Sequence, residues 1–373
     1  MDIFRLNDTG TTWAEGTIIN GLTTKLWSER YRSPGEFKFT APPTKSIMDS
    51  LPLGALVSHT ETLDVMIVES HEIIESQEKD PEISITGRSL DSFLEQRVAT
   101  EDHLGFNNPM HDGSPSPYIF DQSSQTAQIR ALIRSGIQEG YVARSVFALP
   151  HTVVTIRIGD LSFEEEREVK RGPLYDAVMD LLAEMDAGLK IERPNGTKTD
   201  IHWVVHDGDK VLDKVQFSHD AGDLEASRYF RTNKTDKNSA YAMASYGGIY
   251  WGEAGSTGAS GLLRRVMYLD ATDIKLNPIP NDPYGVVAAR IEEMLTKRAK
   301  RVVKRRKKTD ILEATVSKDS RFKYRRDYNI GDLVWVLGNY DTSDIMRVVE
   351  FVESEDENGE KGFPTLVRAT GAN

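Results

Sequence analysis

The fold class follows from three pieces of one segment, KLWSERYRSPGEFKFTAP (25–42), GALVSHTETLDVMIVESHEIIES (54–76) and PEISITGRSLDSFLEQRV (81–98). Apolar residues alternate with polar ones through these pieces, and this period of two is typical of half-buried strands. The alternating residues are Leu26, Phe37, Phe39, Leu63, Val65, Ile67, Ile83 and Ile85. The segment therefore predicts several short strands.

Two further signals set how these strands connect. Pro34-Gly35 marks a turn between the first two strands. Gly87 breaks the alternation, and Leu90, Phe93 and Leu94 then follow at helical spacing. We expect a small β-barrel that is completed by one short helix.

Length and composition indicate a globular chain of several domains. The chain has 373 residues, of which 39% are hydrophobic and 28% charged, and roughly 100 to 200 residues per domain suggests two to four domains. No apolar run approaches the roughly 20 residues of a transmembrane helix, so we expect no membrane span. Cysteine is absent, which excludes disulfides, thiolate nucleophiles and cysteine metal sites.

The middle of the chain mixes helices with strands. Apolar residues of 123–140 share one helical face, with Ser123 or Ser124 as the N-cap. The segment 171–188 predicts a second helix that begins at Pro173 and ends at Gly188. Short strands follow up to about residue 270, and Asp282-Pro283 then starts a long helix. The end of the chain returns to strands, with a hairpin turn at Asn358-Gly359.

These elements predict an α+β fold in which strands are the majority, with two small β-barrel-like domains and inserted α/β and β-meander segments. We divide the chain into four parts. They are an N-terminal β-barrel-like domain (1–100), a mixed α/β domain (101–200), a β-meander plus a long helix with a basic end (201–310) and a C-terminal β-barrel-like segment (311–373).

Candidate catalytic, metal and cofactor sites all have a simpler structural interpretation. His202 and His206 lie four apart in a predicted strand, roughly 13 Å along it, too far apart to share one metal ion. Asp207-Gly208 fits a turn, because the glutamate of a calcium loop is absent. The glycines between 247 and 261 lack the Gly-Lys-Ser/Thr of a phosphate loop. No nucleophile elbow or catalytic triad is recognisable. We expect no enzymatic activity, no metal and no cofactor.

Charge is distributed very unevenly. The net charge is −12, but the run KRAKRVVKRRKK (297–308) holds nine Lys or Arg and no acid, so the rest of the chain carries −21. Such a run could bind nucleic acid, although an acidic surface would repel a polyanion and few aromatics accompany the cations. It could also be a solvated helix end. We favour an acidic protein partner or a neighbouring subunit.

Aromatic residues near the glycine-rich loop are a second candidate contact, although they could equally pack against their own sheet. The candidate interface therefore consists of Lys297, Arg298, Lys300, Arg301, Lys304, Arg305, Arg306, Lys307, Lys308, Tyr246, Tyr250 and Trp251.

Taken in order, four motifs resemble the siphophage minor tail protein or tail hub family of long-tailed phages. RYRSPGEFKFTAP resembles that family's opening strand pair, and GALVSHTETLDVMIVESHEI its next hairpin, with Gly54 before the strand. ISITGRSLDSFLEQRV resembles its strand, glycine and short helix. YNIGDLVWV resembles its late strand, entered through Gly331-Asp332. These motifs cover the first hundred residues well and the last sixty moderately.

The resemblance implies a structural virion protein, a hub of the tail tip or baseplate. Such hubs are homotrimers whose barrels form a ring that continues the tail tube. They contact the distal tail protein, the tape measure protein and other minor tail proteins, and phage DNA passes through them. The protein would be made in the host cytoplasm and reside at the tail tip of the virion. Some relatives carry a wall-degrading domain, which we expect to be absent here.

Two alternative functions stay open at this point. One is a nucleic-acid-binding protein that acts through residues 297–308. The other is a tail-associated cell-wall hydrolase.

Overall fold

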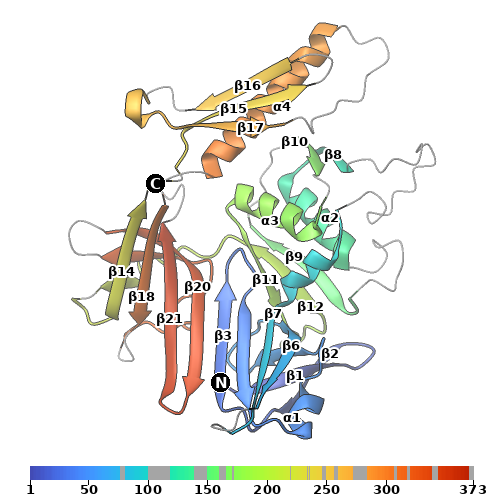
Figure 1. Ribbon diagram of the computed structural model, residues 1–373, viewed down its shortest axis with the longest axis vertical. Coiled ribbons are helices and arrows are strands. Elements are labelled where there is room, and N and C mark those ends of the chain that lie inside the picture. Colours follow the sequence, from blue (N-terminus) through green and yellow to red (C-terminus); the bar gives the residue numbers. More distant parts are fainter. Residues whose placement is uncertain are drawn as a thin grey trace. The chain divides into compact units, whose positions relative to one another are not determined.

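The computed structural model divides the chain into two compact units (Figure 1). The main unit comprises residues 1–228 and 312–373, and the inserted unit comprises residues 229–311. The finer division into four parts stays a prediction. The structure describes residues 1–75, 80–99, 118–137, 149–158, 165–169, 172–218, 220–232, 234, 236–245, 249–255, 259–271, 284–305, 309–316, 320–337 and 343–368.

The described residues up to 99 form strands, as the alternation predicts, with the one expected short helix after the last strand and a second short helix that we did not predict. Two strands near the N-terminus, β1 and β2, come before the segment from which we inferred the fold. The elements are β1 (Ile3–Asp8), β2 (Trp13–Ile18), β3 (Thr24–Arg30), β4 (Glu36–Ala41), α1 (Lys45–Ser50), β5 (Leu56–His59), β6 (Met66–Ile74), β7 (Glu82–Ser89) and the 3₁₀ helix η1 (Leu90–Gln96).

Gly87 lies inside β7 and does not end it. A Cβ at this position would lie 1.9 Å from the carbonyl oxygen of Ile67 on β6. The pairing of β6 with β7 shifts register between Val68 and Ser70, next to this close approach. The glycine is therefore needed for the approach of two backbones at a bulge.

The middle of the main unit is a three-stranded sheet with helices. Its sheet order is β11-β12-β9, with β12 parallel to β9 and antiparallel to β11. The elements are β8 (Tyr118–Ser123), α2 (Gln125–Ile137), β9 (Thr152–Arg157), β10 (Glu165–Val169), α3 (Leu174–Met185), β11 (Gly188–Glu192) and β12 (Ile201–His206).

Both predicted helices of this region are confirmed, with one change at a helix end. Ser124 caps α2, because its Oγ accepts a hydrogen bond from the backbone N–H of Ala127 at 3.3 Å. Helix α3 ends at Met185, three residues before the predicted end at Gly188, and Asp186 follows it in the left-handed conformation (φ 53°). Position 188 requires a glycine because the Tyr31 ring lies close to it: a Cβ there would be 2.3 Å from the ring.

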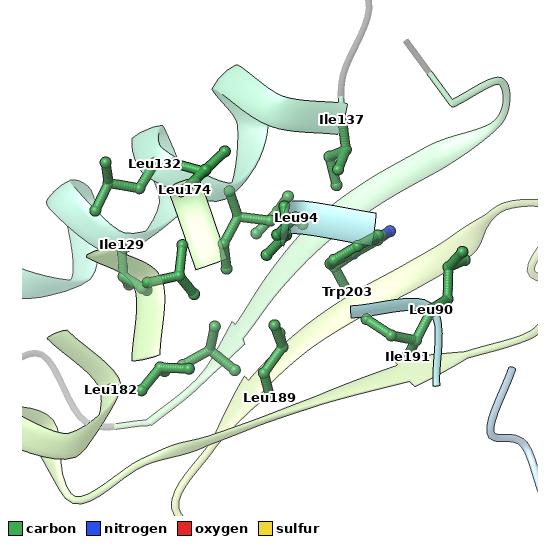
Figure 2. Close-up of a cluster of buried hydrophobic side chains, with 14 of the residues drawn as sticks. Leu90, Leu94, Ile129, Leu132, Ile137, Leu174, Leu182, Leu189, Ile191 and Trp203 are labelled. Atoms are coloured by element: carbon green, nitrogen blue, oxygen red, sulfur yellow. The ribbon is translucent and has the colours of Figure 1, made fainter. Parts of the chain in front are cut away.

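Figure 2 shows the core that these helices build over the three-stranded sheet. Side chains from η1, α2 and α3 converge on β11 and β12, and all are almost fully buried. Burial of each large aliphatic side chain contributes about 1.5–3 kcal/mol. The residues labelled there are Leu90, Leu94, Ile129, Leu132, Ile137, Leu174, Leu182, Leu189, Ile191 and Trp203.

The chain's last part returns to the sheet of its first part. The remaining elements of this sheet are β13 (Gln216–Ser218), β14 (Leu224–Thr232), β18 (Thr309–Val316), β19 (Leu333–Leu337), β20 (Asp344–Asp356) and β21 (Gly359–Arg368). The predicted Asn358-Gly359 turn joins β20 to β21, and Gly359 has φ 102°. One edge of β20 pairs with β19 and then with β3, where Glu353 lies opposite Trp27.

The predicted α+β class with a strand majority is confirmed, but the two β-barrel-like domains form one open sheet. The described strands follow the order β14-β18-β21-β20-β3-β4-β7-β6-β5-β1-β2, and β13 and β19 attach beside β20. This path has two ends, β14 and β2, and does not close on itself. Strand β20 is 13 residues long, so one of its edges can pair with two strands. It pairs with β19 and with β3, and this joins the late strands to the early strands in a single sheet.

The inserted unit is a three-stranded sheet with one long helix. Its sheet order is β16-β15-β17, with β15 antiparallel to β16 and parallel to β17. The elements are β15 (Ser239–Ser245), β16 (Ile249–Gly255), the 3₁₀ turn η4 (Gly261–Leu263), β17 (Val266–Asp270) and α4 (Tyr284–Arg305). The long helix predicted from Asp282-Pro283 is thus confirmed.

Candidate interaction surface

One face of the inserted sheet is covered by helix α4. Alternate residues of β15 are alanines, Ala240, Ala242 and Ala244, and all three are fully buried. They pack against Ile291 and Leu295 of the helix. Small side chains on the strand let the helix backbone come close, so this face is a tightly packed two-layer core.

The opposite face of the same sheet is exposed, and we call it the open face. On β16, Ile249 is 68% exposed and Trp251 51%, and on β17 Tyr268 is 55% exposed. Met243 lies opposite Trp251, and Tyr241 lies opposite Tyr268, so apolar side chains run across all three strands. The open face consists of the apolar residues Tyr241, Met243, Ile249, Trp251, Val266 and Tyr268, together with the acidic residues Glu253 and Asp270 that alternate onto the same side.

The two described aromatic candidates lie on opposite sides of this sheet. Trp251 belongs to the open face, whereas Tyr250 packs against the core beneath α4. Successive residues of a strand point to opposite faces, so the two could not share one surface. Tyr246 lies outside the described residues.

Residues 297–305 of the basic run form the C-terminal end of α4. Lys297 and Lys300 are exposed, and Arg298 is half-buried. Lys297 forms an ion pair with Glu293 one turn earlier, at 3.1 Å. The other six candidates of the run lie outside the described residues or have side chains that are not described: Arg301, Lys304, Arg305, Arg306, Lys307 and Lys308.

A buried ionic cluster joins β3 and β20 of the main unit. Arg325 donates to Glu29 Oε1 at 2.7 Å and to Glu353 Oε2 at 2.9 Å. Thr62 and the Tyr324 hydroxyl also donate to Glu29. Burial acts to raise the pKa of Glu29, but the Arg325 guanidinium and these hydrogen bonds hold it below its usual value.

Burial shifts the pKa values of two neighbouring groups of this cluster towards their neutral forms. Burial lowers the pKa of His59 to about 3, with the Arg325 guanidinium acting in the same direction. Burial also raises the pKa of Asp64 well above its usual value, and the adjacent Glu29 carboxylate adds to this effect. Perturbed pKa values of this kind occur at catalytic sites. Here Glu29 and His59 are 5% and 0% exposed, so these two groups are closed to solvent.

A second buried junction surrounds Arg347 on β20. Its guanidinium donates to the carbonyl of Gly331 at 2.6 Å and to Asp186 Oδ2 at 2.9 Å. The Tyr31 hydroxyl donates to the Asp186 carbonyl at 2.9 Å. Segments far apart in the sequence are thereby fixed to one another. No local sequence pattern indicates either junction.

The histidine pair is not a metal site. His202 and His206 lie on one strand, β12, as predicted. His206 is buried beside the Tyr31 ring at 5.4 Å, and burial lowers its pKa to about 3. Within the described ranges, no three His, Asp or Glu side chains come together as metal ligands. In the same ranges, no helix has the length and apolar character to cross a membrane.

Solved structures with a similar fold define the class of this protein. A 43 kDa tail protein of prophage MuSo2 from Shewanella oneidensis matches with a TM-score of 0.56 and 14% identity, over 99% of this chain and 98% of the other. A tail protein from Neisseria meningitidis MC58 matches with a TM-score of 0.54 and 11% identity, over 98% and 96% of the two chains. Prophage tail protein gp18 from Listeria monocytogenes EGD-e matches with a TM-score of 0.54 and 10% identity, over 100% and 96%. The chain has the fold of phage tail proteins.

The family follows from the sequence itself. Residues 166–364, which are more than half of the chain, match the family of Siphovirus ReqiPepy6 Gp37-like proteins. The chain belongs to this family. The predicted membership of a siphophage tail protein family is confirmed. No curated protein matches the chain in sequence.

Proposed function

We propose that this chain is a non-enzymatic structural protein of the phage tail tip. In this proposal three copies form a hub ring that continues the tail tube. The observation that carries it is the agreement of fold over nearly the full length of both chains with the Shewanella and Neisseria tail proteins. The siphophage family match supports the same role.

The construction of the main unit suits a part that bears load. The first and last strands share one sheet, and the Arg325 and Arg347 junctions tie its distant segments together. Buried charges that are paired and hydrogen-bonded resist separation, because removing one partner leaves the other buried and uncompensated. Such a unit transmits force between neighbours without a moving part.

The partners of the ring belong to the proposal as well. We expect the distal tail protein on one side, and the tape measure protein and other minor tail proteins on the other. Phage DNA would pass through the ring during ejection. The protein would be made in the host cytoplasm and then incorporated at the tail tip.

Labelling of intact virions tests this role. An antibody against the main unit, coupled to gold, should mark the end of the tail that is distal to the capsid. Protein stoichiometry in purified virions should give three copies per particle. Absence from virions, or label along the whole tube, would reject the hub.

A nucleic-acid-binding function is the alternative that one observation favours. The inserted unit contains sixteen Lys and Arg against eight Asp and Glu, a net charge of +8. A basic patch of this size releases counterions on binding, so DNA affinity would fall steeply with salt. Measurement of DNA affinity at increasing salt concentration tests this alternative. The unmodified chain is compared with the triple variant Lys304→Ala, Arg305→Ala, Arg306→Ala. A flat response excludes this alternative.

A further inference from the structure

Two neighbouring leucines at one end of the inserted sheet are almost uncovered. Leu262 is 97% exposed and Leu263 is 73% exposed, the two highest values among the large apolar side chains that the structure describes. Both belong to η4, the 3₁₀ turn that comes shortly before β17. We call residues 260–265 the leucine turn. Single exposed apolar side chains are ordinary, but an adjacent pair without cover marks a contact with another molecule or with a membrane.

The leucine turn is held in one conformation. The backbone N–H of Leu263 donates to the Ser260 carbonyl at 3.1 Å. Asn238, the residue before β15, clamps the turn from the side. Its Nδ2 donates to the Leu263 carbonyl at 2.6 Å, and its Oδ1 accepts from the backbone N–H of Arg265 at 2.8 Å. The leucines are therefore presented by a fixed backbone, which lowers the entropy cost of a contact.

The leucine turn also carries positive charge. Arg264 and Arg265 follow the leucines directly. Arg264 forms an ion pair with Glu253 at 3.1 Å, so this pair adds no net charge. The segments that adjoin the turn, 234–238 and 253–265, together hold four Lys or Arg and two Asp or Glu, a net charge of +2. Apolar side chains next to cations suit the surface of a membrane with anionic headgroups.

The small apolar area favours a lipid surface over a protein partner. A standard protein interface needs about 800 Å² on each partner, and two leucine side chains alone supply far less. A lipid surface needs no complementary pocket, because acyl chains adapt to an apolar side chain while the headgroups meet the cations. We infer that the leucine turn inserts into the surface of a membrane that contains anionic lipids. This inference stands on the inserted unit alone and goes beyond the proposed hub.

The contact of one copy is weak and reversible. Small apolar anchors bind membranes only marginally by themselves, and nearby cations strengthen them. In the proposed tail tip, several copies would bind together and more tightly, because every contact after the first is intramolecular. The isolated chain is therefore tested at high lipid concentration.

Cosedimentation of the full-length chain with vesicles tests the inference. The vesicles contain phosphatidylcholine alone, or phosphatidylcholine with an equal amount of phosphatidylglycerol. We expect binding to the anionic vesicles that decreases as salt is raised. The double variant Leu262→Ser, Leu263→Ser should bind at least about tenfold more weakly.

A leucine in the main unit provides the matched control. Leu53 is 63% exposed, and Leu53→Ser should bind vesicles as well as the unmodified chain does. Equal binding by the unmodified chain and the double variant would overturn the inference. So would an unmodified chain that does not bind anionic vesicles.

A fluorescent label locates the contact. Because the chain contains no cysteine, one environment-sensitive dye can be attached at a chosen residue. Leu262→Cys and Leu53→Cys are each labelled. We expect anionic vesicles to shift the emission at 262 to shorter wavelength and spin-labelled lipids to quench it, with no change at 53. Unchanged emission at 262 while the chain is bound to vesicles would overturn the inference, because the contact would then lie elsewhere.

A protein partner would give a different result, and the proposed hub can fail separately. If the double variant is missing from assembled virions and the unmodified chain ignores vesicles, the turn docks onto another tail protein and the inference fails. If the chain binds vesicles through the turn but gold labelling finds none of it in virions, the hub proposal fails and the membrane contact stands.

Discussion

Arg325 and Glu29 lie 296 residues apart in the sequence, and their side chains meet at 2.7 Å inside the main unit. The guanidinium is 18% exposed and the carboxylate 6%. Each is a charge that the interior accepts only with its partner. Arg325 also pairs with Glu353 of β20, so it links two carboxylates of the neighbouring strands β3 and β20.

The Arg325→Ala variant should lose about 3–5 kcal/mol of the free energy of unfolding, because Glu29 would stay buried without a cation. Denaturant unfolding of the main unit, followed by tryptophan fluorescence, measures the loss. The neighbouring Arg326 is 63% exposed and forms an ion pair with the adjacent Asp327. Arg326→Ala should change the stability by less than about 1 kcal/mol. Equal losses in the two variants would contradict the argument.

The pH dependence of stability should reveal the buried Asp91 of η1. Its side chain is 3% exposed, and burial raises its pKa from 3.8 to about 7. The unfolded chain loses this proton at much lower pH than the folded chain. The contribution of the neutral carboxyl is therefore complete below the unfolded pKa and is lost as pH rises towards about 7.

The Asp91→Asn variant keeps a neutral side chain of the same shape at every pH. Its stability relative to the unmodified chain should rise as pH increases from about 4 to 7, and then stay level. Thermal unfolding in a series of buffers measures this difference. A difference that is independent of pH would show that the Asp91 carboxyl is already ionised in the folded protein.

Local patterns were sufficient to predict most elements of this fold. The alternation in 25–98 predicted β3, β4 and β7, and the apolar stripe after Pro173 predicted α3. Strand pairing over long distances could not be predicted in this way. The contact between β3 and β20 joins residues more than 300 apart, and only tertiary packing selects it. We therefore expected two barrels where one sheet is present.

The candidate surface was predicted in part for a similar reason. Trp251 was named from its chemistry, but so was Tyr250, which points to the opposite side of the sheet. The alanines of β15 carry the signal that was overlooked, because a strand face of small residues is one that a helix can approach closely. The ionic cluster of Arg325 had no local signal at all, since its partners come from distant segments.

The N-cap of α2 can be tested by one substitution. The Ser124 hydroxyl accepts from the Ala127 N–H at 3.3 Å, and no backbone carbonyl of the helix can take its place at this end. Ser124→Ala should cost about 1 kcal/mol of the free energy of unfolding. Arg130→Ala, on the exposed side of the same helix, is the control and should have little effect. No loss for Ser124→Ala would mean that water replaces the cap without cost.

Gly252 on β16 sets how closely helix α4 approaches its sheet. A Cβ at this position would lie 2.4 Å from the Leu295 Cβ and 2.4 Å from the backbone nitrogen of Thr296. The Cβ would also contact the Leu295 carbonyl carbon. This carbon and the Thr296 nitrogen belong to the helix backbone, so rotation of a side chain cannot relieve these two contacts. The helix would have to move away from the sheet. Overpacking of this kind costs about 1–3 kcal/mol.

The Gly252→Ala variant should therefore destabilise the inserted unit while the main unit keeps its stability. Because the inserted unit is a separate compact body, hydrogen exchange should speed up in β15, β16 and α4 and stay unchanged in β3 and β20. Glu253→Ala is the matched control, on the same strand and with its side chain on the opposite face. Faster exchange throughout both units would show that they unfold together, and unchanged exchange would show that the helix can shift without loss of packing.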